Sequence, residues 1–145
     1  MRTTCYLFNK INEHGITGYY ADPEYNRKQD GKVKTILDDK MEVVPIQCDL
    51  IVHSRGNNIK QDNLIAIEMK KSNRPEAERV SDRKRLRALT KDSYDDIWSY
   101  DGIALPEHVC GYVHGVYMIL DIRARTRLFE YYRKGNKVGE RTESF

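Results

Sequence analysis

The sequence predicts an α/β domain in which a mixed central sheet is flanked by helices. Three observations predict it: an amphipathic segment precedes the first strand-like run, two β-branched apolar runs are joined by a turn-rich link, and a charged helical segment separates them from two further apolar runs. Helices interspersed among strands are typical of layered α/β folds. Because 145 residues is about the size of one domain, we expect residues 1–145 to fold as a single unit.

The elements before residue 45 are predicted from spacing and turn signals. Apolar side chains at helical spacing in residues 6–11, followed by Gly15, predict a short first helix. Residues 19–25 indicate a first strand, in which Pro23 suits an edge or a strand end. A weaker strand signal covers residues 33–37.

The second helix is the clearest predicted element after the two central strands. It opens at Pro75 and ends near Thr90. Carboxylates in its first turn complement the helix dipole, and apolar residues recur on one side. These residues are Glu76, Glu78, Val80, Leu86 and Leu89. Residues 112–122 and 126–132 predict two more strands, which gives the order α-β-β-β-α-β-β.

Composition favours a chain that stays in a reducing compartment. No apolar stretch approaches the roughly 18 residues that a membrane span needs, and the N-terminus lacks the apolar run of a signal peptide. Three widely spaced cysteines, Cys5, Cys48 and Cys110, argue against a disulfide scaffold. We therefore expect a cytoplasmic protein with no membrane contact.

Charge is unevenly distributed along the chain, although the net charge is only +3. Residues 70–90 carry 8 Lys/Arg against 3 Asp/Glu, and residues 123–145 carry 7 against 3, whereas residues 91–122 carry 1 against 6. Two basic blocks around an acidic one can attract phosphate backbones to one face. Solvated helices and tails explain the same pattern equally well.

A carboxylate–lysine cluster is predicted on the hairpin formed by residues 48–53 and 64–70. Alternate strand residues share a face, so Glu68 and Lys70 point one way and the apolar residues Ile65, Ile67 and Met69 point the other way, into a core. Pairing the two strands would bring Asp49 beside Glu68.

Two carboxylates at such range raise each other's pKa unless a cation compensates them, and Mg²⁺ or Mn²⁺ prefers such oxygen ligands. A metal held by Asp49 and Glu68 would activate water against a phosphate, with Lys70 steadying the developing charge. The alternative is a surface Glu–Lys pair on an edge strand, with Asp49 capping a turn.

Four segments together resemble a group of small PD-(D/E)XK nuclease-like proteins. Residues 22–27 (DPEYNR) are similar to that group's D-x-E-Y-N-R, and residues 48–56 (CDLIVHSRG) to P-D-I-I-V-H-x-R-G. Residues 64–71 (LIAIEMKK) resemble its N-L-L-V-I-E-x-K-K, and residues 82–90 its D-x-x-K-L-x-x-L-T helix. The resemblance implies a restriction-endonuclease-like αβββαβ core.

The resemblance also implies roles for individual residues. Asp49, Glu68 and the backbone carbonyl of Met69 would be metal ligands, Lys70 the catalytic lysine, and Glu24 an additional catalytic carboxylate. Two departures stand out. Cys48 replaces the usual proline, and Arg85 replaces the usual lysine, which keeps the charge but changes donor geometry.

Further polar residues are candidates for contact with nucleic acid. They are Arg27, Lys71 and Arg85, and for each of them a structural or solvated role is an alternative. Asp82, on the same helix as Arg85, is expected to be solvated. His53 would either touch substrate or bond to a neighbouring backbone group. A zinc site from His108, Cys110 and His114 is disfavoured, because the spacing suits no closed four-ligand set.

Together the pattern and the resemblance predict an Mg²⁺- or Mn²⁺-dependent endonuclease that hydrolyses phosphodiester bonds in nucleic acid, DNA in particular. The alternatives are a non-catalytic module that binds nucleic acid or a protein partner, and a metal-stabilised structural protein. A homodimer is compatible with cleavage of both strands.

Overall fold

The computed structural model describes residues 2–23, 35–37, 43–45, 48–92 and 111–145. Two helices and eight strands lie within these ranges. In chain order they are α1 (Arg2–Glu13), β1 (Tyr20–Pro23), β2 (Thr35–Leu37), β3 (Val43–Pro45), β4 (Leu50–His53), β5 (Asn63–Lys71), α2 (Glu76–Leu89), β6 (His114–Asp121), β7 (Thr126–Arg133) and β8 (Asn136–Ser144).

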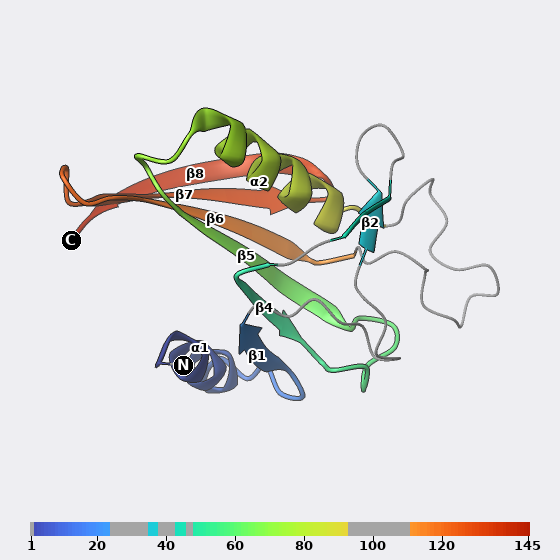
Figure 1. The fold of residues 1–145 in the computed structure, drawn as a ribbon. Coiled ribbons are helices and arrows are strands. Elements are labelled where there is room, and N and C mark those ends of the chain that lie inside the picture. Colours follow the sequence, from blue (N-terminus) through green and yellow to red (C-terminus); the bar gives the residue numbers. More distant parts are fainter. Residues whose placement is uncertain (1, 24–34, 38–42, 46–47, 93–110) are drawn as a thin grey trace.

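Six of the strands form one mixed sheet in the order β1-β4-β5-β6-β7-β8 (Figure 1). Only β5 and β6 pair in parallel, while each other neighbouring pair is antiparallel. A parallel pair needs a long crossover connection, and α2 lies on that crossover between β5 and β6. The expectation of an α/β fold with a mixed sheet is confirmed. Strands β2 and β3 pair separately.

Helix α2 starts and stops where its sequence predicts. Pro75 occupies the N-cap position and Thr90 the C-cap position. The Thr90 hydroxyl donates to the carbonyl of Leu86 at 2.9 Å, which satisfies one of the last carbonyls of the helix. Helix α2 lies across one face of the sheet and contacts β5, β6 and β7 (Figure 1).

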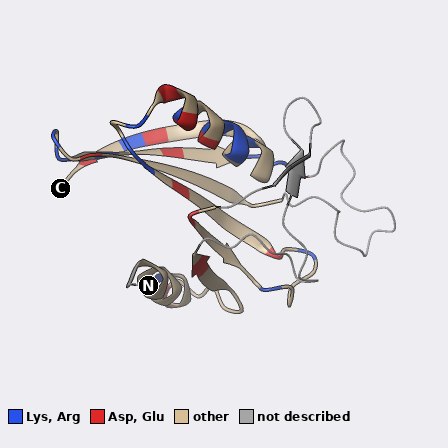
Figure 2. Ribbon diagram, viewed as in Figure 1, with Lys and Arg blue, Asp and Glu red and all other residues tan. Residues whose placement is uncertain are grey.

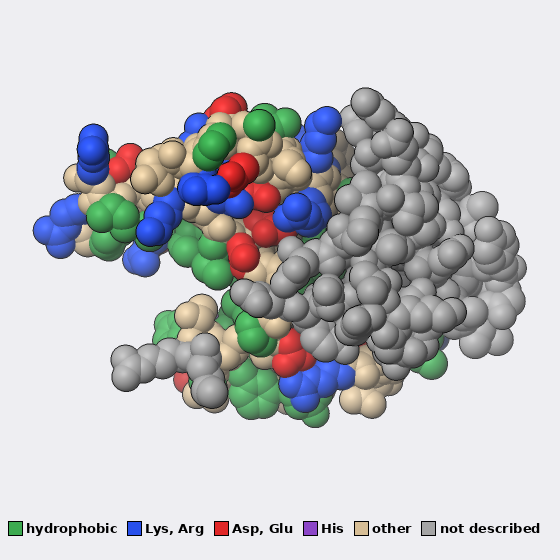
Figure 3. Space-filling view, viewed as in Figure 1, with side chains coloured by type: hydrophobic (Ala, Val, Ile, Leu, Met, Phe, Trp, Pro, Cys, Tyr) green, Lys and Arg blue, Asp and Glu red, His purple; other side chains and the backbone are tan. Residues whose placement is uncertain are grey.

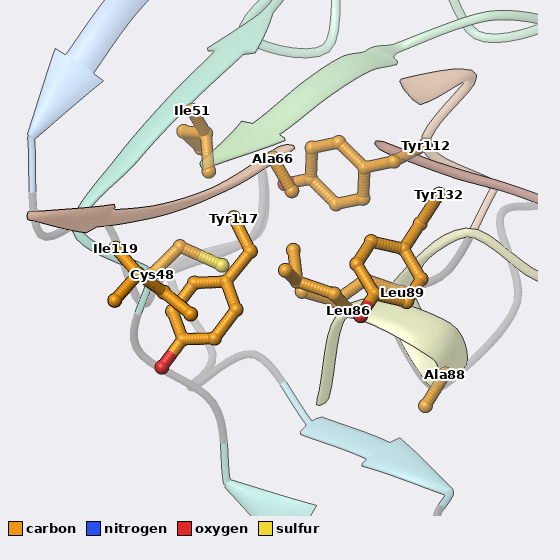
Figure 4. Close-up of a cluster of buried hydrophobic side chains, with 10 residues drawn as sticks. All are labelled: Cys48, Ile51, Ala66, Leu86, Ala88, Leu89, Tyr112, Tyr117, Ile119 and Tyr132. Atoms are coloured by element: carbon orange, nitrogen blue, oxygen red, sulfur yellow. The ribbon is translucent and has the colours of Figure 1, made fainter. Parts of the chain in front are cut away.

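The hydrophobic core fills the layer between α2 and the sheet (Figure 4). Leu86 and Leu89 from α2 are fully buried there, against the rings of Tyr117 on β6 and Tyr132 on β7. The remaining buried members are Cys48, Ile51, Ala66, Ala88, Tyr112 and Ile119. Burial of each large apolar side chain contributes on the order of 2 kcal/mol, so this layer holds α2 in place.

An ion-pair network also fastens α2 to the sheet. The Arg83 guanidinium donates to both carboxylate oxygens of Glu130 on β7, with Nε and Nη2 each 3.0 Å from an oxygen. Glu130 is buried and also accepts a hydrogen bond from the Tyr132 hydroxyl at 2.8 Å. Because a buried carboxylate is costly unless it is paired, this network fixes which side of α2 faces the sheet.

Two expectations about burial are wrong. On β5 the core lies on the side of Ala66 and Glu68, which are buried, whereas Ile65 and Ile67 are half-buried and Met69 is exposed. The reason is that α2 covers the Ala66 side, where a small side chain lets the helix approach. Val80, expected on the apolar side of α2, is 42% exposed.

Element boundaries follow the predictions closely where the chain is described. The first helix, the hairpin strands, α2, β6 and β7 were all expected, whereas β3 and β8 were not. Strand β1 covers Tyr20–Pro23 of the predicted strand 19–25, and β2 covers Thr35–Leu37 of the predicted strand 33–37. The remaining residues at those strand ends lie outside the described ranges. Neither α1 nor α2 has the length and apolar character of a membrane-spanning helix.

Candidate active site

The hairpin of β4 and β5 positions the two carboxylates that the sequence singles out. Leu50 pairs with Ile67 in the antiparallel ladder, and Asp49 and Glu68 are the next residue on each strand at that end. Asp49 Oδ2 accepts a hydrogen bond from the backbone N–H of Met69 at 2.7 Å. The Asp49 side chain is thereby tied to the end of β5, immediately beside Glu68.

Glu68 is a buried carboxylate with a strongly perturbed pKa. Its side chain faces α2 and the residue is 4% exposed. Burial raises the pKa of Glu68 to about 7, the nearby Arg85 opposes this rise, and the negative charges of Asp49 and Asp82 add to it. Near neutral pH the group therefore exchanges its proton readily, and its charged form calls for a compensating cation.

Arg85 supplies that cation from α2. Its Nη1 donates to Glu68 Oε1 at 2.6 Å and lies 3.3 Å from Asp82 Oδ1. The guanidinium bridges a carboxylate of the sheet and a carboxylate of its own helix one turn earlier. Arg85, expected as a nucleic-acid contact, is thus engaged with the carboxylate cluster.

Lys70 lies on the same side of β5 as Glu68, two residues further along the strand. Its Nζ is 3.3 Å from Asp82 Oδ2 and 3.5 Å from Glu78 Oε2. Partial burial lowers the pKa of Lys70, but the charges of Asp82 and Glu78 outweigh it and the pKa is raised. Lys70 is therefore an ammonium at neutral pH, suited to stabilising negative charge rather than to accepting a proton.

Asp82 organises both cations, although the sequence pattern suggests only a solvated helix residue. It is 4% exposed, and its Oδ2 accepts a hydrogen bond from the Tyr117 hydroxyl at 2.9 Å. Asp82 therefore contacts Lys70, Arg85 and Tyr117 at once. Two sequence signals mark Asp82: its spacing of three residues from Arg85 and four from Glu78, and its place at the start of the segment 82–90 that resembles a D-x-x-K-L-x-x-L-T helix.

The cluster has the donors that a hard divalent ion takes. Asp49, Glu68 and Asp82 bring three carboxylates against the two cations Lys70 and Arg85, so an excess of negative charge exists once Glu68 ionises. Asp49 Oδ1 and Glu68 Oε2 form no hydrogen bond within the described part of the chain. Two carboxylates with water and phosphate make up a common Mg²⁺ site.

Among the described residues, no three His, Cys, Asp or Glu side chains converge as a ready-made metal cage. Mg²⁺ does not require one, because it usually retains several waters and uses only one or two carboxylates. The donor chemistry of Asp49 and Glu68 is therefore suited to this ion, and Arg85 is the group with which it would compete.

Of the three remaining catalytic and nucleic-acid-binding candidates, one lies within the described residues, and it is apart from the cluster. Glu24 and Arg27 lie outside the described residues. Lys71 is exposed at the end of β5, on the side of the sheet away from Lys70. Figure 2 shows charged residues on α2 and along the neighbouring strands. In the space-filling view of Figure 3, basic and acidic side chains lie side by side next to α2.

A second ionic cluster joins β1 to β4. Asp22 accepts two hydrogen bonds from Arg55, at 2.9 and 2.7 Å, and its Oδ2 lies 2.7 Å from His53 Nε2. The Arg55 guanidinium also lies over the ring of Tyr20, 4.3 Å from its centroid. His53 is 2% exposed, and the Asp22 carboxylate is one of its partners at this junction.

Comparison of the chain with protein-family models, with curated proteins and with solved structures finds no match. The candidate site is accordingly defined by its own geometry: a buried carboxylate on β5, a second on the residue before β4, and two cations held by Asp82.

Proposed function

We propose that this chain is a divalent-metal-dependent nuclease that hydrolyses phosphodiester bonds in nucleic acid, DNA in particular. One observation carries the proposal: a buried Glu68, whose pKa is raised to about 7, lies beside Asp49 and pairs with Arg85 of α2, while Lys70, two residues further along β5, pairs with Asp82. Perturbed carboxylates of this kind concentrate at functional sites.

The arrangement of elements supports a restriction-endonuclease-like core. Within the large sheet and its helices, the chain order α1-β1-β4-β5-α2-β6 is that of an αβββαβ unit, with β2 and β3 as an addition between β1 and β4. The proposed ligands stand immediately before the second strand of that unit (Asp49) and on its third strand (Glu68), and Lys70 follows Glu68 by two residues.

Each residue of the cluster has a distinct role in the proposed reaction. Asp49 and Glu68 would hold Mg²⁺ or Mn²⁺, with the Met69 carbonyl as a further ligand. Such an ion, when bound, polarises the phosphate and lowers the pKa of a bound water. Lys70 keeps its proton and stabilises charge on the phosphate oxygens, while Asp82 holds the ammonium and the Arg85 guanidinium toward the site.

Strand scission tests this proposal directly. Wild type and Lys70→Ala are incubated with labelled single- and double-stranded DNA and RNA, with Mn²⁺ or with EDTA. We expect scission by the wild type with Mn²⁺ only, and loss of at least a hundredfold in rate in Lys70→Ala, because a preorganised charge at the transition state contributes about 2.7–4 kcal/mol.

Lys60→Ala is the matched control for Lys70→Ala. Lys60 is an exposed lysine in the link between β4 and β5, at the opposite end of β5 from Lys70. It should cut like the wild type. Scission that is indifferent to Lys70, or that persists in EDTA, would mean that the activity comes from elsewhere.

A second candidate function is a non-catalytic nucleic-acid-binding module. The ion pair between Arg85 and Glu68, at 2.6 Å, favours it, because a protein cation already neutralises the carboxylate. This candidate predicts salt-sensitive nucleic-acid binding that survives Lys70→Ala, with no scission under any metal.

A further inference from the structure

A pocket lies at the end of the sheet, one residue beyond Lys70. The final residue of β5, Lys71, pairs with Leu120 of β6, so the link after β5 and the turn between β6 and β7 lie side by side. Ser72 donates its backbone N–H to the carbonyl of Leu120 at 2.8 Å, which joins the two segments. Between them is a pocket of about 430 Å³. Its lining includes Lys71, Ser72, Asn73, Asp121, Ile122 and Arg123.

The cations around this pocket have no carboxylate partner among the described residues. Lys71, Arg123 and Arg125 are exposed, and none forms an ion pair within the described ranges. Asp121 is the acidic residue of the pocket lining, and its Oδ1 accepts the backbone N–H of Ala124 at 2.9 Å, which shapes the turn. The pocket therefore presents positive charge that the protein itself does not neutralise.

Four arginines on or just before α2 differ in this respect, because each of them is held by an ion pair. They are Arg74 with Glu78, Arg79 with Glu76, Arg83 with Glu130, and Arg85 with Glu68 and Asp82. A phosphate approaching these four arginines would have to displace a carboxylate, whereas one approaching the turn between β6 and β7 would not. Among the described residues of α2, Lys84 and Arg87 are the cations that are exposed without an ion pair. The turn is accordingly a better anion-binding surface than the four paired arginines.

We propose that Lys71, Arg123 and Arg125 bind the phosphate backbone of the nucleic acid at the end of the sheet where β5 carries Lys70. The inference rests on the proposed function and names the surface that its polymeric substrate would follow. Guanidinium groups bind phosphate in a bidentate manner, and such contacts position the polymer without reading its sequence. Ile122, 57% exposed between Asp121 and Arg123, offers an apolar contact to sugars or base edges.

The opposite end of β7 supplies a matched control. Arg123→Glu/Arg125→Glu changes two exposed arginines at the start of β7, and Arg133→Glu/Lys134→Glu changes two exposed cations at its end. Each pair includes one residue in the left-handed region, Arg125 at φ 51° and Lys134 at φ 48°. The charge change is the same, and the sites are about 30 Å apart along an extended strand.

The measurement is fluorescence anisotropy with short labelled DNA, double- and single-stranded, in EDTA and over a range of NaCl concentrations. We expect Arg123→Glu/Arg125→Glu to weaken binding at least tenfold at low salt. The slope of log K against log salt should fall in magnitude by about 2 for the duplex, since two phosphate contacts are lost. Arg133→Glu/Lys134→Glu should keep the wild-type slope. Lys71→Glu, which leaves the turn intact, should lower the slope by about 1.

Equal losses in the two double variants would overturn the inference, because the effect would then be one of net charge. Wild-type affinity in Arg123→Glu/Arg125→Glu, or no DNA binding by the wild type at low salt, would overturn it too. The proposed function fails separately. If Mn²⁺-dependent scission is absent but the surface binds DNA, the proposed function is wrong and the binding surface stands. If scission occurs but Arg123→Glu/Arg125→Glu binds DNA as the wild type does, only the binding surface is wrong.

Discussion

At the scale of single residues, Glu68 lowers the free energy of unfolding by an amount that depends on pH. Its folded-state pKa of about 7 lies above the ordinary value of 4.5, so the folded chain binds the proton more tightly than the unfolded chain. Stability is therefore highest below about pH 4.5 as far as this group is concerned, and it falls as the pH rises through about 7. The loss across that window is on the order of 3 kcal/mol.

Glu68→Gln should remove this cost, since an amide remains neutral at every pH. The variant should gain stability relative to the wild type as the pH is raised from 5 to 8, by up to about 3 kcal/mol. Urea unfolding at several pH values measures the difference. Glu140→Gln is the control, because this carboxylate of β8 is exposed and its partner Lys137 lies at the surface. If the difference in unfolding free energy between Glu68→Gln and the wild type did not change with pH, Arg85 would fully compensate the charge of Glu68.

The residue scale also explains which part of the candidate site could be predicted. Asp49, Glu68 and Lys70 interrupt apolar strands, and that interruption is visible in the sequence. Asp82 has no such signal, because a carboxylate among charged helix residues resembles a solvated side chain. Its burial arises from the packing of α2 against Tyr117, which depends on two elements 35 residues apart.

At the scale of elements, the long predicted strands β5, β6 and β7 carry apolar or aromatic runs that are visible in the sequence. Strand β8 lacks such a run: its sequence NKVGERTES is almost wholly exposed, and it is held by backbone pairing with β7. An edge strand rich in charge is a common way to prevent further strand addition, so its polar sequence suits its place at the edge. From the sequence alone, the same polar residues indicate a loop, because their pairing with β7 is not visible there.

The orientation of β5 was missed for a related reason. Its large apolar residues Ile65 and Ile67 predict a core on their side, yet α2 packs on the side of Ala66 and Glu68. A small residue there permits close approach of the helix, and the polar residues are satisfied by partners on α2. Whether a buried polar residue of β5 finds a partner depends on how α2 packs against the strand. The alternation of residues along one strand does not show this.

Close approach of α2 to β6 gives a prediction at this scale. A Cβ on Gly115 would lie 2.9 Å from Thr90 Cγ2 and 3.1 Å from Tyr132 Cβ. Gly115→Ala should therefore destabilise the fold by about 1–3 kcal/mol through overpacking. Gly139→Ala on β8 is the control, as its Cβ would meet nothing within 4 Å, and it should be neutral or slightly stabilising. Equal thermal stability of the two variants would contradict this packing.

At the scale of the whole molecule, a block of charge in the sequence and a charged surface are different things. In the basic block of residues 70–90, five of the eight cations form ion pairs, and the other three are exposed without one among the described residues. The paired ones are Lys70, Arg74, Arg79, Arg83 and Arg85, and the unpaired ones are Lys71, Lys84 and Arg87. The block of residues 123–145 keeps exposed cations without such partners at both ends of β7, among them Arg123 and Lys134. In each block, the cations without ion pairs are the ones that are free to act on a distant anion.

The cluster around Glu68 should couple the stability of the entire fold to divalent metal. An ion that binds the folded chain alone raises its stability, and about tenfold excess over Kd contributes about 1.4 kcal/mol, or roughly 4 °C in Tm for a domain of this size. Protons compete for Glu68, whose pKa is about 7, so the rise caused by millimolar Mn²⁺ should be larger at pH 8 than at pH 5.5. Differential scanning fluorimetry measures both rises.

Asp49→Asn/Glu68→Gln should abolish the rise at both pH values, because it removes the two carboxylates while preserving their shape. Glu140→Gln should retain it, since that carboxylate lies on β8 and bonds to Lys137. A rise that persists in the double variant would place the metal elsewhere in the chain. A rise of the same size at both pH values would show that the ion does not compete with the Glu68 proton, and Arg85 would then remain the partner of that carboxylate.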